Sequence, residues 1–161
     1  ASVYGGLTVA ASAGVLTLSP HPGFGLVVWI PDTTTSTDRS RVALSDTVAR
    51  SDAVHGIGNT ALLVHALTTG NTQFLPAAAN DRLHQPGRLD ARPDAASAME
   101  KFTAAGAIAA WLSGSGPTVA ALVDIDAAET VATRMSAEDG SRVQIINLDV
   151  DGLVIEDEPV A

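Results

Sequence analysis

Two apolar runs separated by one short glycine-rich turn constrain the fold of this chain more than any other feature. Residues 107–112 and 119–123 are long and apolar enough to form buried strands, and only residues 113–118 lie between them. The spacing predicts two adjacent strands of one hairpin, which would hold the turn on a rigid scaffold.

The turn is rich in glycine and hydroxyl groups, beginning with Ser113, Gly114, Ser115 and Gly116. Without bulky side chains in the way, the backbone N–H groups of such a turn can approach an anion closely. The composition indicates either a phosphate or carboxylate site, or a hairpin loop whose glycines only supply positive φ angles. The turn by itself leaves both interpretations open.

The composition favours an ordinary globular domain and argues against several classes of partner. The 161 residues are 46% hydrophobic but only 4% aromatic, so the core must consist mainly of Ala, Val, Leu and Ile. Nine basic and eighteen acidic residues give a net charge of −9, which repels a phosphate backbone and an anionic membrane surface. We therefore expect no nucleic-acid partner and no membrane partner.

The reactive and ionisable residue types narrow the chemistry further. The chain has no cysteine, which excludes disulfides, thiolate nucleophiles and zinc–thiolate sites. No apolar stretch reaches the roughly 18 residues that cross a bilayer, and the first residues lack the order of a signal peptide, so a cytoplasmic protein is expected. Lys101 is the only lysine, so recognition of an anion must fall to the eight arginines.

The order of the predicted elements indicates an α+β fold. Apolar patterning and turn residues predict strands at 15–19, 24–30 and 142–148, and helices at 45–69, 71–80, 94–105 and 127–135. Together with the hairpin, this is a split βαβ arrangement, the ferredoxin-like order β-α-β-β-α-β, with an extra helical layer in the first crossover. The acidic tail at 156–161 is expected to fray.

The sequence Pro-His-Pro-Gly at 20–23 marks the only domain boundary that the pattern suggests. Residues 1–23 would be a short remnant of a preceding domain, and residues 24–161 the main domain. The remnant's strand has no partner nearby in the sequence, and unpaired strands and uncovered apolar segments favour association. We therefore expect a homodimer or a covering partner.

Two polar clusters outside the hairpin carry candidate binding residues. Thr37 follows a predicted strand and can cap a short helix that would place Arg41 on its first turn. A capped polar loop with solvated arginines would give the same pattern. The second cluster, at residues 81–88, is compatible with a plain loop, and His84 alone is weak evidence for acid–base chemistry.

Taken in order, these clusters resemble the C-terminal part of the homoserine kinase family, within the GHMP kinase superfamily. The turn at 113–118 is similar to the third motif of the superfamily, and the Asp-Arg-Leu-His-Gln-Pro run at 81–86 points more narrowly to homoserine kinases. Residues 1–7 resemble the segment after the family's His-Pro-Asp-Asn loop. The resemblance covers nearly the whole chain and implies a GHMP kinase C-terminal domain, preceded by a remnant of the N-terminal domain.

The resemblance also implies which residues bind the acceptor. Thr37, Arg41 and Arg88 match acceptor-site positions, with the two arginines holding a carboxylate, and Gly116 would lie at the substrate. Two guanidinium forks around one carboxylate would fix the acceptor's hydroxyl for in-line attack. At Gly87 the sequence departs from the family, which usually has tyrosine there.

The remaining motif residues are implied to have supporting roles. Ser113, Gly114, Ser115 and Gly116 match the turn that lines the active site and supports the phosphate loop of the family. A further set would orient the Arg88 segment without touching the ligand: Asp81, His84 and Gln85. The sequence assigns no catalytic base and no metal ligand.

The implied reaction is ATP-dependent phosphorylation of the L-homoserine side-chain hydroxyl to O-phospho-L-homoserine, a step of threonine biosynthesis, with Mg²⁺. The family's ATP-binding loop and metal-associated residues precede the part that this chain resembles, so we expect the chain alone to be inactive and to bind neither ATP nor Mg²⁺. Its partners would be L-homoserine and the missing N-terminal half. Two alternatives remain: a non-catalytic amino-acid-binding or dimerisation domain, and a GHMP kinase for another homoserine-like alcohol.

Overall fold

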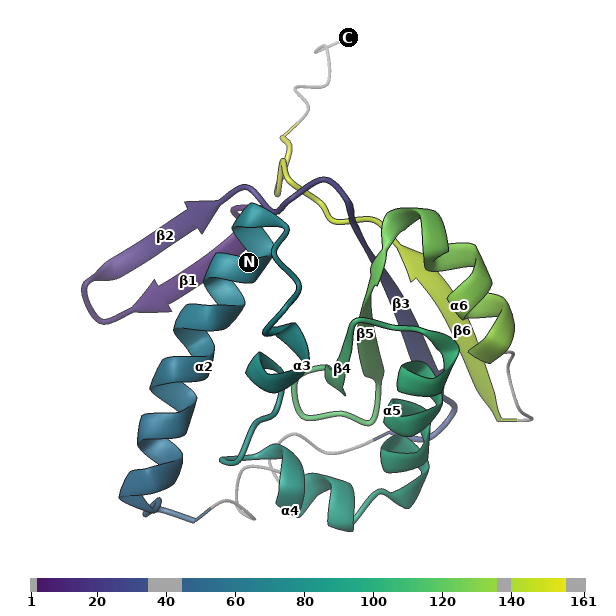
Figure 1. Cartoon of the computed structure of the whole chain (residues 1–161), viewed down its shortest axis with the longest axis horizontal. Helices are drawn as coiled ribbons and strands as arrows, with labels where there is room; N and C mark the ends of the chain where they lie inside the picture. The colour runs from purple at the N-terminus through teal and green to yellow at the C-terminus, as the bar shows by residue number, and fades with distance from the viewer. Residues whose placement is uncertain (1–2, 35–44, 136–139, 156–161) are drawn as a thin grey trace, which may run out of the picture.

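A four-stranded antiparallel sheet forms the centre of the computed structural model, which describes residues 3–34, 45–135 and 140–155 (Figure 1). The spatial order of its strands is β4-β5-β3-β6. Counted along the chain within this sheet, that order is second, third, first, fourth, as in the split βαβ arrangement. The α+β fold expected from the sequence is confirmed. The strands are β3 (Phe24–Pro31), β4 (Ala109–Leu112), β5 (Val119–Asp124) and β6 (Ser141–Ile146).

Helices cover both faces of this sheet. Figure 1 shows α5 and α6 on one side of the sheet, and α2 with α3 on the other. None of the helices in the described part of the chain is long and apolar enough to cross a membrane. The helices are α2 (Arg50–Thr69), α3 (Leu75–Ala78), α4 (Gln85–Asp90), α5 (Pro93–Ala105) and α6 (Ala128–Met135), with a short 3₁₀ turn at Ile125–Ala127.

The face covered by α5 and α6 holds the larger core. The residues that α5 buries recur every three or four positions, which places them in one stripe along the helix. Phe102 lies in this stripe and packs with Val27 of β3 and Val131 of α6, all of which are inaccessible to solvent or nearly so. Pro93 in the first turn and Gly106 in the left-handed conformation delimit α5, as the sequence predicts.

The opposite face is covered much less completely. Only Ala66 is buried among the twenty residues of α2, and it belongs to a small cluster with Phe24, Leu75 and Leu122. Leu122 and its neighbour Val123 on β5 point to opposite faces, because side chains alternate along a strand. α2 therefore rests on the sheet only near its C-terminal end.

Two helix predictions were too long. The helix predicted at 45–69 begins at Arg50, since Ala49 is extended (φ −64°, ψ 140°) and makes no side-chain cap. The helix predicted at 71–80 shortens to α3, because Asn71 Oδ1 accepts the Gln73 N–H and holds the chain in a turn. Residues 81–88 were also compatible with a plain loop, which holds for 81–84 but not beyond, since α4 starts at Gln85.

The expectation of an unpaired strand near the N-terminus is wrong as well. The predicted strand, β2 (Gly14–Leu18), pairs antiparallel with β1 (Leu7–Ala11) across a two-residue turn. Neither strand has a buried residue, and together they form a separate two-stranded sheet. The division of the chain at residue 23 stays a prediction.

The two ends of the described chain meet backbone to backbone. The Gly6 N–H donates to Asp149 O at 2.7 Å, and the Leu153 N–H donates to Val3 O at 3.2 Å. Between these bonds, Gly5 and Gly152 both have positive φ angles, and a Cβ on either would lie 2.6 Å from the other's backbone nitrogen. Only glycine fits at this crossing.

Candidate active site

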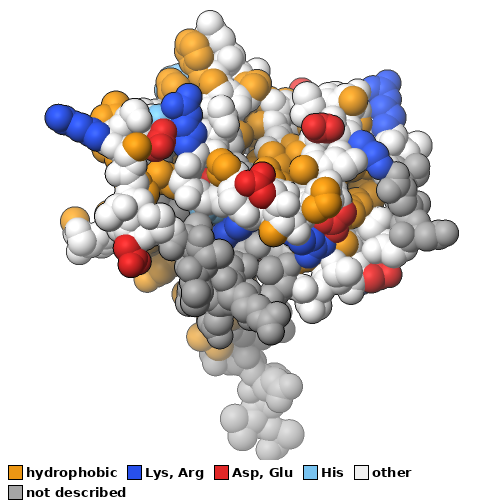
Figure 2. Space-filling view, turned by 90° about the horizontal axis from the view of Figure 1, so that it is seen from below, with side chains coloured by type: hydrophobic (Ala, Val, Ile, Leu, Met, Phe, Trp, Pro, Cys, Tyr) orange, Lys and Arg blue, Asp and Glu red, His pale blue; other side chains and the backbone are white. Residues whose placement is uncertain are grey.

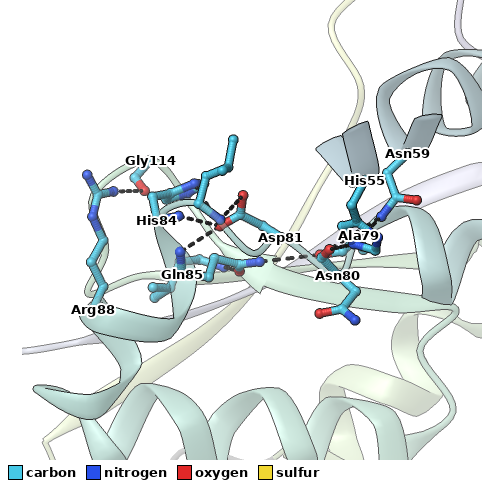
Figure 3. Close-up of polar contacts among 11 residues, drawn as sticks. His55, Asn59, Ala79, Asn80, Asp81, His84, Gln85, Arg88 and Gly114 are labelled. Atoms are coloured by element: carbon cyan, nitrogen blue, oxygen red, sulfur yellow. Dashed lines mark hydrogen bonds and ion pairs between the residues drawn. The ribbon is translucent and has the colours of Figure 1, made fainter. Parts of the chain in front are cut away.

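Asp81 organises the start of α4. Its Oδ2 accepts the backbone N–H groups of His84 at 2.8 Å and Gln85 at 2.6 Å, and its Oδ1 accepts that of Leu83 at 3.1 Å (Figure 3). The Gln85 N–H is one of the donors that an α-helix leaves without partners at its N-terminus, and Leu83 and His84 directly precede the helix. His84 Nδ1 also lies 2.9 Å from Asp81 Oδ2. The carboxylate thus caps α4 from four residues before its first residue.

The same contacts fix the protonation state of Asp81. Burial raises the pKa of its carboxyl, but the hydrogen bonds from the N–H groups of Gln85, His84 and Leu83, together with the His84 charge, outweigh burial. The net result is a pKa below the ordinary value of 3.8. Asp81 is therefore an anion near neutral pH, and its role here is to hold the backbone.

Gln85 connects three segments through its side chain. It is the only polar residue classed as buried in the described part of the chain. Its Oε1 accepts the backbone N–H of Leu112 at 2.8 Å, and its Nε2 donates to Ala79 O at 3.3 Å. α4 is thereby attached both to the end of β4 and to the loop after α3.

Arg88 contacts the glycine turn directly. Its Nη1 donates to Gly114 O at 2.9 Å, and Figure 3 shows the side chain reaching from α4 to the turn. Its Nε is buried and has no hydrogen-bond partner in the described part of the chain. The structure thus brings together two clusters that lie about 26 residues apart in the sequence, and leaves one buried cationic donor unused.

The turn closes the β4–β5 hairpin as the sequence predicts. The Ser113 N–H donates to Thr118 O at 2.9 Å, and the Gly116 N–H donates to Ser113 O at 3.1 Å. Gly114 and Gly116 have φ angles of 61° and 73°, which favour glycine, and Ser115 lies between them. A Cβ on Gly114 would meet nothing within 4 Å, so one side of the turn is open space.

The end of β3 approaches the same region. Arg92 Nη2 donates to Thr33 Oγ1 at 2.8 Å, and Arg92 Nε donates to Asp94 Oδ1 at 2.9 Å. The hydrogen bond from Arg92 lowers the pKa of Asp94. Thr37 and Arg41 lie outside the described residues, so their predicted roles stay predictions.

A feature that the sequence did not indicate is an apolar cavity of about 660 Å³ between α2 and the β4 edge of the sheet. Ile57 and Leu63 of α2, Leu75 of α3 and Trp111 of β4 contribute to its lining. No local pattern marks such a space, because its walls come from segments far apart in the sequence.

Polar contacts connect α2 to the wall of this cavity. Asn59 Nδ2 donates to Ala77 O at 2.9 Å, and His55 Nε2 donates to Asn80 O at 2.9 Å (Figure 3). The ion pair between Arg82 and Asp52 spans 3.8 Å and is exposed, so it contributes little. Together these contacts join α2 to the segment that leads into α4.

The end of the molecule that carries α4 and the turn has mixed charge. Figure 2 looks at this end and shows Lys and Arg side chains interspersed with Asp and Glu. The described residues contain no group of three or more His, Cys, Asp or Glu that could hold a metal ion.

Comparison with known proteins gives this geometry a family. The sequence profile described as "GHMP kinases C terminal" matches residues 63–141. A homoserine kinase from Gloeobacter violaceus is 41% identical over 117 residues, and one from Desulfitobacterium hafniense is 38% identical over 138 residues. The chain carries a homoserine kinase-like GHMP kinase C-terminal domain.

Solved structures agree with this assignment. The crystal structure of homoserine kinase from Cytophaga hutchinsonii superposes with a TM-score of 0.85 at 26% identity, over 92% of this chain and 50% of that chain. The mevalonate kinase of L. major superposes with a TM-score of 0.60 at 14% identity, over 90% of this chain and 48% of that chain, which shows the shared fold alone.

This GHMP kinase C-terminal domain accounts for only part of its relatives. The match spans 73% of this chain and 39% of the Gloeobacter protein, and 83% of this chain and 46% of the Desulfitobacterium protein. The chain therefore spans less than half the length of these curated relatives. The family uses ATP and Mg²⁺, whereas the described residues of this domain do not offer a cluster that fits the metal.

Proposed function

We propose that this chain provides the acceptor side of a homoserine kinase, which transfers the γ-phosphate of ATP to the side-chain hydroxyl of L-homoserine and forms O-phospho-L-homoserine. The hydrogen bond from Arg88 Nη1 to Gly114 O carries the proposal. It joins the arginine that the motifs assign to the acceptor's carboxylate to the turn that they assign to the phosphoryl side. The similarity to homoserine kinases supports this choice of substrate.

Arg88 has the chemistry of a carboxylate ligand. A guanidinium presents five donors in a planar fork, and a carboxylate can accept two of them side by side. Nη1 is engaged with Gly114, so the acceptor would use other donors of the fork, among which the buried Nε lacks a partner in the described part of the chain. Thr37 and Arg41 would complete this site. Thr33, which lies four residues before Thr37, accepts a hydrogen bond from Arg92, just beyond the end of α4.

Phosphoryl transfer depends mainly on positioning and on electrostatic stabilisation. In the proposed site, Arg88 would orient the acceptor, and the turn at 113–118 with Gly116 would line the transfer site. We assign no catalytic base and no metal ligand to this chain. ATP and Mg²⁺ would be bound by the remaining part of a longer protein, so the 161-residue chain alone would be inactive.

The apolar cavity beside α2 supports a covering partner. Val54 and Ile57 are exposed on α2 next to it, and Leu83 is exposed on the facing loop. Apolar residues gathered around a cavity favour association. We propose that the N-terminal half of the enzyme, or a second copy of the chain in a homodimer, covers this side.

A chimera tests the proposed activity. The part of the Desulfitobacterium hafniense homoserine kinase that matches this chain would be replaced by the chain, and ADP release would be measured with ATP, Mg²⁺ and L-homoserine. We expect homoserine-dependent turnover, and a loss of about 10- to 100-fold in kcat/KM for Arg88→Ala, because a hydrogen bond between charged groups contributes about 1.5–3 kcal/mol. A folded chimera without turnover would refute the proposal.

Calorimetry on the 161-residue chain distinguishes the alternatives. A separate amino-acid-binding domain should bind L-homoserine on its own, and Arg88→Ala should abolish that binding. The acceptor half of an active site should bind neither L-homoserine nor ATP tightly. Turnover by the purified chain, with its intact mass confirmed, would contradict the expected inactivity.

A further inference from the structure

The side chain of Gln85 occupies an unusual position next to the glycine turn. It is buried, and both ends of its amide are engaged, with Leu112 N–H at Oε1 and Ala79 O at Nε2 (Figure 3). Leu112 is the last residue of β4 and directly precedes Ser113, the first residue of the turn. Gln85 therefore grips the strand at the point where the turn begins.

The hydrogen bond from the Leu112 N–H to Gln85 Oε1 takes the place of a bond to a neighbouring strand. In the described part of the chain, β4 pairs only with β5 and so forms an edge of the sheet. The Ser113 N–H donates across the hairpin to Thr118 O, and successive N–H groups of a strand point in opposite directions, so the Leu112 N–H points away from β5. Gln85 Oε1 is the acceptor that satisfies this buried edge donor.

A second contact from the same helix reaches the turn two residues further on. Gln85 and Arg88 lie three positions apart on α4, and residues at this spacing are neighbours on one face of a helix. Arg88 reaches Gly114 O, and Gln85 reaches Leu112 N. One contact alone would let α4 pivot against the turn, whereas two contacts fix both its distance and its rotation.

The loop before α4 prevents the helix from sliding. The Gln85 backbone N–H donates to Asp81 Oδ2 at 2.6 Å, and its side chain donates to Ala79 O. The preceding loop thus fixes Gln85 through Asp81 and Ala79, and Gln85 in turn binds Leu112 of β4. The contacts behind Gln85 are local, within six positions, whereas the contact with Leu112 crosses 27 positions.

We propose that Gln85 is a positioning residue that sets the distance between the Arg88 guanidinium and the glycine turn, and thereby the preference for an acceptor that carries a carboxylate. The inference rests on the proposed function, in which Arg88 binds that carboxylate and the turn lines the transfer site. It adds that selectivity depends on a side chain that does not touch the substrate.

The physical reason is that the hydrogen bonds between Arg88 and a carboxylate are directional. A hydrogen bond between a guanidinium and a carboxylate is short and requires a fixed geometry, and a displacement of about 1 Å can reduce a rate by about 100-fold. For an acceptor that carries a neutral carboxamide in place of the carboxylate, the rate depends much less on the position of Arg88. Loosening α4 should therefore lower the rate with the carboxylate substrate more than the rate with its amide.

The first experiment uses NMR on the 161-residue chain and does not depend on kinase activity. Gln85→Leu removes both amide contacts, and we expect the amide signals of Leu112 and of residues 113–118 to shift and to exchange faster with solvent. Gln73→Leu, at an exposed glutamine, is the matched control and should leave these signals unchanged. Turn signals that stay in place in the Gln85→Leu chain would overturn the positioning role.

Gln85→Glu provides a rescue by pH. A protonated carboxyl presents one acceptor and one donor, as the amide does, and burial raises the pKa of the introduced carboxyl. Below that pKa the turn signals should match those of the wild type, and above it they should move away. The ionisable groups nearby are Asp81, His84 and Arg88, and neither α3 nor β4 carries an ionisable side chain. A parallel titration of the wild type shows which changes of the turn signals come from these groups. If Gln85→Leu does not fold, the titration of Gln85→Glu tests the proposal instead. Turn signals that do not change with pH in this variant would overturn the positioning role of Gln85.

The second experiment measures selectivity in the chimera. The ratio of kcat/KM for L-homoserine to kcat/KM for homoserine amide should fall about tenfold in Gln85→Leu and stay constant in Gln73→Leu. A merely destabilised enzyme would lose both activities equally, and an unchanged ratio would overturn the inference. A wild-type chimera without activity would instead refute the proposed function and the selectivity with it, while the NMR result would still decide whether Gln85 holds the turn.

Discussion

The two faces of the central sheet are covered by different kinds of interaction. On the side of α5 and α6, apolar side chains interlock, and Phe102 and Val27 have no exposed surface. On the side of α2 and α3, the apolar cluster is small and a cavity of about 660 Å³ remains. Hydrogen bonds from Asn59 and His55 join α2 to the segment at residues 77–80.

The difference indicates which face of the sheet is stable without a further covering partner. A densely packed apolar face needs nothing further to be stable. A face with a cavity and exposed apolar residues has a surface left to bury, which agrees with the proposal that another part of the enzyme, or another copy, covers it. Arg88, for which an acceptor role is proposed, lies on α4, whose neighbour Leu89 packs against the larger core while Arg88 itself makes a polar contact with the turn.

The three phenylalanines of the chain sharpen this comparison most, because each samples one environment. Phe102→Ala empties the tight face and should lower the free energy of unfolding by about 4–5 kcal/mol. Phe24→Ala, in the small cluster below α2, should cost about 3 kcal/mol, because fewer neighbours surround the lost ring. Urea denaturation of each variant measures both values.

Phe74 provides the surface control for this pair. It is 45% exposed, and Phe74→Ala should change stability by less than about 1 kcal/mol. Equal losses at Phe102 and Phe24 would break the comparison, because they would mean that the two faces are packed alike.

Asp81→Ala tests the polar side of the comparison. Removing the cap of α4 should lower the free energy of unfolding by about 1–2 kcal/mol at pH 7. The pKa of Asp81 is lower in the folded chain than in the unfolded chain, so its contribution is fully present above the unfolded value of 3.8 and is lost as pH falls through the lower folded value. Denaturation of wild type and variant between pH 7 and pH 2 should show the two converging at low pH.

Asp90 is the control for this experiment. It is exposed at the end of α4, and Asp90→Ala should change the free energy of unfolding at pH 7 by less than about 0.5 kcal/mol. A difference between wild type and Asp81→Ala that persists at the lowest pH would show that the carboxylate charge does not support α4.

Asn59→Ala measures how far hydrogen bonds hold α2 in place. The loss of the bond to Ala77 O should cost about 1 kcal/mol, a typical net value for a neutral hydrogen bond. Hydrogen exchange should become faster along α2 and stay unchanged along α5. Asn80→Ala keeps the backbone carbonyl that His55 uses and serves as the control. Faster exchange of α5 in the Asn59 variant would indicate that the two faces unfold together.

Gly58→Ala should give the smallest effect, a gain of about 0.5–1 kcal/mol. Gly58 lies inside α2, and a Cβ there would meet nothing within 4 Å, so alanine only restricts the unfolded chain and favours the helix. Gly114 has equally open space but a φ of 61°, so Gly114→Ala should instead lose about 1 kcal/mol. Thermal unfolding of both variants checks the signs. A loss at Gly58 would mean that α2 needs its flexibility.

Features that depend on neighbouring residues were predictable from the sequence. The hairpin around the glycine turn and the limits of α5 follow from apolar runs, Pro93 and Gly106, all of which act over a few residues. The split βαβ arrangement of the main sheet follows from the order of the predicted strands and helices along the chain. The start of α2 was missed since no side chain caps it, and the β1–β2 pair was missed because β1 was not predicted as a strand.

Features that depend on distant contacts were not predictable. The motif residues of α4 were expected to support Arg88, but their partners could not be named, since Gln85 reaches Leu112 across 27 positions. Arg88 was assigned to the acceptor, whereas only the fold reveals its contact with Gly114 and an Nε that lacks a partner among the described residues. The cavity depends on how α2 lies over the sheet, which no local pattern determines.

The crossing of Gly5 and Gly152 makes the described chain a nearly closed ring. Because the Leu153 N–H donates to Val3 O, a short linker could join residue 155 back to residue 3 without moving either strand of the main chain. New ends could then be opened at the exposed turn between β1 and β2. A circular permutant of this kind should keep both sheets and the α4 contacts, since the order in which the segments are synthesised is not what holds them together.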